Sequence, residues 1–298
     1  MYVDLLAHVR RKHEEHVHMI QVYIPCPFPE DREKFAYVKM KVRRHLGKDL
    51  DAKRIAEMPE NRVIHKIACD VYLRWRSMSG DDAGGHVKPL IRRYHIFQLS
   101  LDRKDNTKAH FVDNGLSNIS FVILGVNNGA EHRETKHSLV GTYGEGTVAE
   151  FIRRRGMSVD LDAIMKRETK PSVKYGDKKK PNVVYGSCWH VYYKDEKTKA
   201  QFGSIGEFFT HGLELLKKQH ARCAISDIPM DGHRGSTDSF FQPSLDAIDP
   251  KLGHVKGNLR WVILCLNATD HSKVNPNDSK ASRWTKEKFE SYCGINPL

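Results

Sequence analysis

The stretch FQPSLDAIDPKLGHVKGNLRWVILCLN, from Phe241 to Asn267, places two acids, a histidine and two asparagines within an apolar alternation. Alternating apolar positions predict one strand over PSLDAID and a second over NLRWVI, in which Leu259, Trp261 and Ile263 share a face. The turn-rich segment PKLGHVKG joins the two strands, and LCLNATDHSK is expected to begin a helix. The stretch therefore predicts a β-β-α unit.

A fainter copy of this stretch lies earlier in the chain, from Phe97 to Asn127. The two copies align with a constant offset of 144 from Phe97 to His110, and with an offset of 140 from Asn118 to Asn127 after four extra residues. About a dozen aligned positions carry the same residue, whereas unrelated segments of ordinary composition would share roughly two. The repeat predicts two related hairpins, at about 97–124 and 241–264, each followed by a helix.

Helices are also predicted outside the repeat. Phe35, Val38, Val42 and Leu46 recur at helical spacing, and Gly47 is expected to end that helix. Segments 158–168 and 204–219 are expected to be helices, the second with a capping box of Ser204 and Glu207, and Thr147 with Glu150 predicts another capping box. Segment 188–203 resembles a hairpin. The basic segment 169–186 is either an exposed connection or an arm that orders on nucleic acid.

The domain organisation follows from the repeat and from a glycine-containing linker at 136–146. We expect an N-terminal half, 1–140, with a helical region and a degenerate ββα unit at about 97–134. The C-terminal half, 141–298, contains the second unit at about 219–275. The predicted fold class is α+β, with two ββα units on one chain and additional helices.

The composition favours a polyanionic partner. The 298 residues carry 49 Lys plus Arg against 37 Asp plus Glu, which gives a formal net charge of +12, and basic runs occur at 153–155 and 178–180. Six cysteines without a C-x-x-C pair argue against a zinc ribbon and against a dense disulfide framework. Neither a leader pattern nor an apolar run of about 18 residues is seen. A soluble, intracellular protein without a membrane partner is expected.

At this point a resemblance to a known family becomes specific. The second copy resembles the HNH nucleases of the ββα-metal, or His-Me finger, superfamily, and is most similar to members with the signature P-S-L-D-R-I-D-x-x-x-G-Y-x-x-x-N followed by a helix bearing Asn. A cysteine-led segment, CAISDIPM at 223–230, is similar to the one that often precedes this signature. The likeness covers about 55 residues of the second half and, weakly, about 40 of the first. The matching residues are Pro243, Ser244, Leu245, Asp246, Ile248, Asp249, Gly253, Asn258, Trp261, Val262 and Asn267.

The resemblance implies a metal site. In the family, the strand Asp and the helix Asn bind a divalent cation, which here implies Asp246 and Asn267 as ligands of Mg²⁺ or a similar ion. Their counterparts in the first copy are Asp102 and Asn127. Carboxylate and amide oxygens are ligands that suit such hard cations.

The family's general base is missing from this chain. A His directly after the strand Asp activates water in the family, but Ala247 and Arg103 stand at that position here. Two kinds of replacement remain open: His254 with its counterpart His110, and Asp249 with its counterpart Asp105. A neutral imidazole accepts a proton near pH 7, whereas a carboxylate holds a metal or positions water. We favour His254 as the base, assisted by Asp249.

Other polar residues are given supporting roles. Asn258 and Asn118 are expected to fasten the hairpin loops through backbone hydrogen bonds. Lys256 and Arg260 flank the second hairpin and are candidates for phosphate contacts, as is Arg103. Arg103 also offers a guanidinium that could fill the metal site of the first copy.

The favoured function is a metal-dependent DNA endonuclease that hydrolyses phosphodiester bonds, with site-specific homing, mobile-element or restriction roles. Two units on one chain would let a monomer act on double-stranded DNA as a pseudo-dimer. Two alternatives stay open. One is a nuclease-derived DNA-binding protein that has lost catalysis, and the other is a nuclease of structured RNA.

Overall fold

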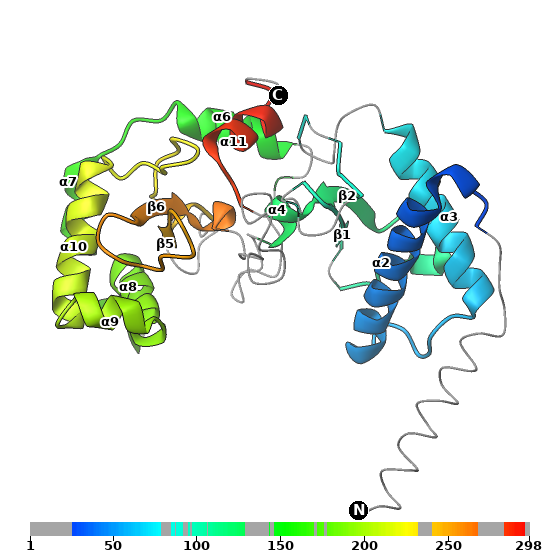
Figure 1. Cartoon of the computed structure of the whole chain (residues 1–298), viewed down its shortest axis with the longest axis horizontal. Coiled ribbons are helices and arrows are strands. Elements are labelled where there is room, and N and C mark those ends of the chain that lie inside the picture. The colour runs from blue at the N-terminus through cyan, green and yellow to red at the C-terminus, as the bar shows by residue number, and fades with distance from the viewer. Residues whose placement is uncertain are drawn as a thin grey trace, which may run out of the picture. The chain divides into compact units, whose positions relative to one another are not determined.

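The computed structural model of the chain describes residues 26–78, 85–86, 88–91, 95, 97–105, 107–128, 143, 146–169, 172–175, 178–231, 240–267 and 283–295, without the side chains of 127–128, 172–175 and 178–181. Helices and short antiparallel strands make the fold mixed α+β (Figure 1). These residues form two compact units. The first contains the described residues up to Ser77 together with Thr107–Asn118, and the second contains the others. No helix in these ranges is long and apolar enough to cross a membrane.

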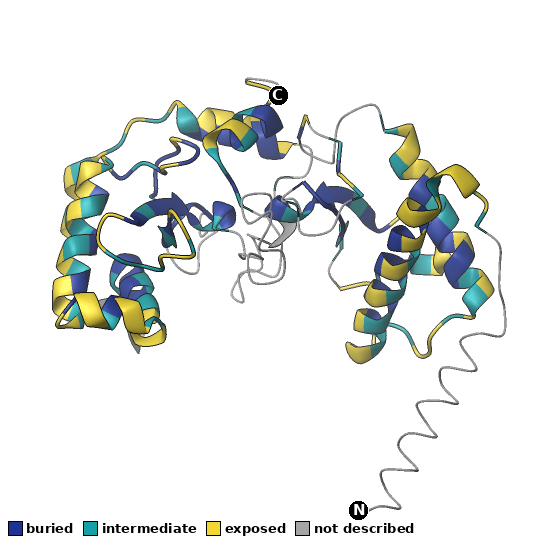
Figure 2. Cartoon of the chain, viewed as in Figure 1, coloured by how far each residue is buried: buried dark blue, intermediate teal, exposed yellow. Residues whose placement is uncertain are grey.

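The first unit is built on two packed helices, α2 (Arg32–Asp51) and α3 (Asn61–Ser77), preceded by the short 3-10 helix η1 (Pro29–Asp31). Val38 and Val42 of α2 and Ile67 of α3 are fully buried, and the buried stripe along each helix is visible in Figure 2. A second 3-10 helix, η2 (Val112–Asn114), lies in the segment Thr107–Asn118. Apolar residues at helical spacing thus form this core, as the sequence predicts.

The end predicted for α2 is wrong. The helix does not stop at Gly47 but continues to Asp51. The extra turn buries Asp49 completely, and its carboxylate accepts hydrogen bonds from His110. Glycine lowers helix stability without forbidding the helix, so a buried tertiary contact outweighs its preference for a C-terminal position.

The second unit contains both predicted hairpins. The first consists of β1 (Leu99–Arg103) and β2 (Ile119–Ile123), and the second of β5 (Pro243–Ala247) and β6 (Leu259–Ile263). Their registers match at every pair: Leu99 faces Ile123 where Pro243 faces Ile263, and Asp102 faces Ser120 where Asp246 faces Arg260. Both segments therefore form the predicted hairpins, with corresponding registers.

The segments that follow the two hairpins differ in detail. After β2 comes α4 (Leu124–Asn128), which contains Asn127, whose side chain lies outside the description. After β6 comes the 3-10 helix η5 (Leu264–Leu266), with Asn267 as its C-cap, whereas residues 268–273 of the predicted helix lie outside the described residues. One hydrogen bond recurs in both copies. The amide of Leu124 donates to the carbonyl of Gln98 at 2.7 Å, and that of Leu264 to the carbonyl of Gln242 at 3.0 Å.

The remaining elements of the second unit are mostly helices. In chain order they are α6 (Thr147–Arg155), α7 (Leu161–Glu168), the strand pair β3 (Ser172–Tyr175) and β4 (Lys178–Pro181), α8 (Val183–Lys194), α9 (Glu196–Gln201), α10 (Ile205–Lys218) and α11 (Lys286–Tyr292).

The two predicted capping boxes have different outcomes. The Ser204 cap of α10 is confirmed, because its side chain accepts from the amide of Glu207 at 3.2 Å, and Glu207 accepts from the amide of the preceding residue, Gly203. The box predicted at Thr147 is wrong. That residue is the first of α6, after Gly146, and Glu150 instead pairs with Arg153 and Arg154.

The hairpin predicted over 188–203 is also wrong, since these residues form the end of α8, all of α9 and the turn after it. The side chain of Asn182 caps α8 by accepting from the amide of Tyr185 at 2.6 Å. Val184 and Cys188, four residues apart, are buried on one helical face. The aromatic residues that suggested strands, Trp189 and Tyr193, lie half exposed on the other face. Burial at helical spacing therefore outweighs their strand propensity.

Trp261 of β6 lies at the centre of the packing around the second hairpin. It is fully buried, and its indole Nε1 donates to the carbonyl of Gly212 in α10 at 2.8 Å. A β-carbon added at Gly212 would lie 2.8 Å from the Cys188 sulfur and 3.3 Å from the Trp261 ring. Glycine thus lets α8 and α10 approach the hairpin closely, and Ser187 of α8 accepts from the amide of Leu245 on β5.

The two copies share one core. Helix α4 of the first copy packs against η5 of the second, and Phe97, Val126, Phe241 and Ile263 belong to the same buried cluster. The predicted halves, 1–140 and 141–298, therefore differ from the two compact units, because the first hairpin lies in the same unit as the C-terminal residues. The predicted linker, 136–146, falls almost wholly outside the described residues.

Candidate functional site

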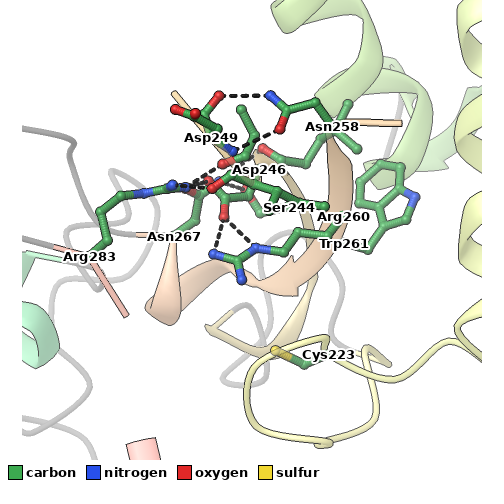
Figure 3. Close-up of polar contacts among 12 residues, drawn as sticks. Cys223, Ser244, Asp246, Asp249, Asn258, Arg260, Trp261, Asn267 and Arg283 are labelled. Carbon is green, nitrogen blue, oxygen red and sulfur yellow. Dashed lines mark hydrogen bonds and ion pairs between the residues drawn. The ribbon is translucent and has the colours of Figure 1, made fainter. Parts of the chain in front are cut away.

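The polar centre of the second hairpin is Asp246, which lies on β5 directly opposite Arg260 of β6. Arg260 Nε donates to Asp246 Oδ2 at 2.8 Å and its Nη2 forms an ion pair with the same oxygen at 2.8 Å, while Arg283 Nη2 donates to Oδ1 at 2.8 Å (Figure 3). The three side chains are 20%, 14% and 13% exposed for Arg260, Asp246 and Arg283 respectively. We call these three residues the arginine–aspartate centre. Its formal charge is +1, because two guanidinium groups face one carboxylate.

Arg283 reaches this centre from the residues just before α11. Besides Asp246, it donates from Nη1 to the carbonyl of Ile248 at 2.6 Å and from Nη2 to the carbonyl of Ala247. The next residue, Trp284, is buried, its ring centroid lies 6.0 Å from that of Phe97, and its Nε1 lies 3.4 Å from the carbonyl of Gly125. Residues of the first copy therefore hold Trp284 in place, and Trp284 in turn positions Arg283.

Asn267 is held beside β5. Its Nδ2 donates to Ser244 Oγ at 2.8 Å and to the carbonyl of Leu245 at 3.0 Å. Because a carbonyl only accepts, the second bond fixes which end of the side-chain amide is the nitrogen. Within the described ranges no hydrogen bond is made to Asn267 Oδ1. The predicted pair of ligands is thus brought close together, because Asn267 bonds to Ser244 and Leu245, which directly precede Asp246 on β5 (Figure 3).

The arrangement around Asp246 does not fit the divalent cation that the family resemblance implies. Both carboxylate oxygens already accept hydrogen bonds from guanidinium groups. A third cation within a few ångström would be repelled by both arginines in a partly buried site. In the part of the chain that the structure describes, no group of three or more His, Cys, Asp or Glu side chains could hold a metal ion. The Mg²⁺ site remains a sequence-based expectation.

Asn258 shapes the loop of the second hairpin. Its Oδ1 accepts from the amide of Asp249 at 2.8 Å, and its Nδ2 donates to the carbonyls of Asp249 and Gly253, each at 2.7 Å. Gly253 has a φ of +78°, which glycine adopts without strain. Asn118 makes the corresponding bond in the first copy, from Nδ2 to the carbonyl of Ala109 at 2.8 Å. These are the hydrogen bonds of loop-fastening residues.

His254 is anchored by a carboxylate that the sequence did not single out. Its amide donates to Asp195 Oδ2 at 3.0 Å, and its Nδ1 lies 3.2 Å from the same oxygen. Thr198 donates to the carbonyl of His254 at 2.9 Å, so the loop is tied to the start of α9. Burial acts to raise the pKa of Asp195, but the hydrogen bonds from His254 and Lys197 outweigh it and lower that pKa.

His110 repeats this anchoring in the first copy. Its amide donates to Asp49 Oδ2 at 2.6 Å, and its Nδ1 lies 2.8 Å from that oxygen. Its Nε2 lies 3.0 Å from Nδ1 of His45, so both ring nitrogens have polar partners and the ring is buried. The base roles of His254 and His110 remain predictions. The geometry shows a shared arrangement, in which a carboxylate within or capping a helix binds a loop histidine through its amide and Nδ1.

The buried His45 makes stability pH-dependent. Burial, then the neighbouring His110 and the charges of Lys48, Lys41 and Arg44, hold the pKa of His45 well below its usual value of 6.5. The unfolded chain therefore binds a proton that the folded chain does not, and stability falls as the pH drops below about 6.5. Urea unfolding at pH 7.5, 6.5 and 5.5 should show that the free energy of unfolding decreases more steeply with falling pH for the wild type than for His45→Gln. Parallel declines would contradict this assignment.

The other predicted residues lie at the rims of the two hairpins. Asp249 Oδ1 accepts from the amide of Lys251 at 2.9 Å, as in an Asx turn. Lys256 donates its amide to Gln201, and its Nζ lies 5.1 Å from the centroid of the Phe202 ring. Asp102, Arg103 and Asp105 are partly buried at the end of β1 and just after it.

Comparison with protein-family models, with curated proteins and with solved structures finds no match to this chain. The functional argument therefore rests on the arginine–aspartate centre and on the repeated hairpin. Sequence reasoning missed Arg283, Asp195 and Asp49. Only the basic composition could have indicated Arg283, because no local motif surrounds it.

Proposed function

We propose that this protein binds double-stranded DNA through the second hairpin. The observation that carries the proposal is the arginine–aspartate centre, in which two guanidinium groups surround the one carboxylate that the resemblance assigns to a metal. A site of net positive charge suits an anionic phosphodiester, and the chain as a whole carries a formal charge of +12. Binding rather than cleavage is the function that this geometry supports best.

The two similar hairpins suggest how the chain would contact a DNA duplex. Both hairpins belong to the second compact unit, have the same register and pack through α4 and η5. A monomer with two such units would present related surfaces to the two strands of a duplex, as a pseudo-dimer does. The first hairpin has Ser120 where the second has Arg260, so the two surfaces would contact DNA unequally.

Metal-dependent DNA endonuclease is the second candidate, of the site-specific homing or restriction type. The position of Asn267 favours it, because Asn267 Nδ2 donates to the carbonyl of Leu245, the residue before Asp246 on β5. A bound Mg²⁺ would supply Lewis-acid charge, but Arg260 and Arg283 would have to leave Asp246 first. Cleavage of structured RNA remains open on the same grounds.

Duplex binding is the first test. We expect fluorescence anisotropy with a labelled DNA duplex to give a Kd of about 10⁻⁴–10⁻⁶ M near physiological salt, weakening steeply as salt increases. Unlabelled duplex DNA should compete better than structured RNA. Absence of salt-dependent binding would contradict the proposal, and better competition by RNA would redirect it to RNA.

A plasmid-nicking assay separates the two candidates. Supercoiled DNA is incubated with the protein and Mg²⁺ or Mn²⁺, and the binding function predicts that it stays intact. Nicking that EDTA and Asp246→Asn both abolish would instead establish the endonuclease. Glu196→Gln is the matched control, because this exposed acid pairs only with Lys199 within the described residues.

A further inference from the structure

We propose that Arg260 and Arg283 form a metal-independent site for one phosphodiester group, with Asp246 as the bridge that holds both guanidinium groups in place. The inference rests on the proposed DNA-binding function and names the site and its chemistry. In this site the carboxylate is not a ligand waiting for a cation. It is the internal counter-ion that aligns two arginines.

The first support is the supply of hydrogen-bond donors. A guanidinium has five N–H groups in a planar fork. Arg260 uses Nε and Nη2 on Asp246, which leaves both N–H groups of Nη1 unused by any described partner. Arg283 uses Nη2 on Asp246 and Ala247 and one N–H of Nη1 on Ile248, which leaves its Nε–H and the second N–H of Nη1 without a partner among the described residues. Both arginines therefore keep donors for an anion.

The second support is positional rigidity. Arg260 is fixed by its cross-strand register opposite Asp246, and Arg283 is fixed by three hydrogen bonds and by the buried neighbour Trp284. Guanidinium groups that are already ordered lose little conformational entropy when they bind. Partial burial also strengthens their attraction for an anion relative to exposed lysines.

The third support is the charge balance. A carboxylate with two bound guanidinium groups leaves one excess positive charge among these three described side chains, in a site that is mostly shielded from water. One phosphodiester, with a charge of −1, neutralises this excess. A divalent cation would raise the local charge to +3, so an anion and a metal are alternatives at this position.

The direction in which one substitution changes duplex affinity distinguishes an anion site from a metal site. Asp246→Asn removes a negative charge, which raises the charge of the site to +2, and retains one oxygen that can accept from one of the two arginines. At an anion site, this change leaves duplex affinity unchanged or increases it. At a metal site, the same change removes a ligand and weakens metal-dependent binding.

The experiment measures duplex affinity by anisotropy for the full-length chain, in EDTA and in Mg²⁺ at matched ionic strength. We expect equal affinities in the two buffers, a loss of about tenfold in both Arg260→Gln and Arg283→Gln, and no loss in Asp246→Asn. The slope of log affinity against log salt should fall by about 0.9 in each arginine variant. Arg62→Gln is the control, because Arg62 is exposed and pairs with Glu60, and less than a twofold change is expected.

Arg283→Lys controls for a folding artefact, since it keeps the charge but removes the planar guanidinium. Its duplex affinity should lie between those of the wild type and Arg283→Gln. Binding that is stronger in Mg²⁺ than in EDTA, and weakened by Asp246→Asn, would overturn the inference in favour of a metal site. Unchanged affinity in both glutamine variants would overturn it while leaving DNA binding intact. Absence of wild-type binding would instead remove the proposed function.

Discussion

Trp261→Ala is expected to lose about 3–5 kcal/mol of unfolding free energy, the largest stability effect predicted for a residue of the second hairpin. The indole is fully buried between β5 and the helices α8 and α10. Its removal leaves a large cavity and breaks the hydrogen bond between the indole and the carbonyl of Gly212. Because Gly212 brings the backbone of α10 close to the ring, the surroundings cannot collapse into the cavity without moving that helix.

Urea unfolding followed by far-ultraviolet circular dichroism measures this loss. Trp189→Ala is the matched control, because Trp189 is 49% exposed on α8 and its removal should change the unfolding free energy by less than about 1 kcal/mol. Similar losses in the two variants would show that the packing around Trp261 is not the main support of the hairpin.

Asp49→Ala is expected to destabilise the first unit by about 3–5 kcal/mol. The carboxylate has no solvent exposure and binds the amide and Nδ1 of His110, with Arg54 at 3.6 Å. Without it, two buried donors lose their acceptor, and the chain Asp49–His110–His45 is broken at its charged end.

Asp51→Ala is the control for Asp49→Ala, since Asp51 is an exposed residue at the end of the same helix and should have little effect. The second copy offers a graded comparison. Asp195 performs the same anchoring for His254 but is 22% exposed, so Asp195→Ala should lose only about 0.5–1.5 kcal/mol. Equal losses at Asp49 and Asp195 would contradict the role assigned to burial.

The two hairpins were predictable because their information is local. A strand needs only alternating apolar residues, and Leu245, Trp261 and Ile263 supply them. The repeat then specified which residues pair, because the four-residue insertion of the first copy falls in its loop and leaves the register unchanged. The loop-fastening position of Asn258 follows equally from neighbouring backbone groups.

The helix α8 was missed because its sequence is ambiguous. Val, Trp and Tyr favour strands when they are considered singly, and Trp189 and Tyr193 are such residues. Their helical state depends on Val184 and Cys188 being buried against the second hairpin and α10. That contact joins residues far apart in the sequence, so no window around 188–203 contains it.

The arginine–aspartate centre was missed for a related reason. Arg260 was expected to contact phosphate, and its place opposite Asp246 follows from the strand register. Arg283, however, is 37 residues from Asp246, and its contact depends on where Trp284 is buried. When the contact of Arg283 is not known, Asp246 resembles an available metal ligand. The sequence therefore favoured a metal cation at the position where the structure has guanidinium groups.

Trp284 also makes the two copies structurally dependent on each other, so that they are not independent modules. Its ring packs beside Phe97, and its indole nitrogen faces Gly125, both in the first copy, while the preceding residue completes the centre of the second. A protein fragment of residues 141–298 would lack the contacts of Trp284 with Phe97 and Gly125. Arg283 would then lose the support that aligns it with Asp246. The first copy thus supports the second, and substitutions near Phe97 and Gly125 would alter the position of Arg283.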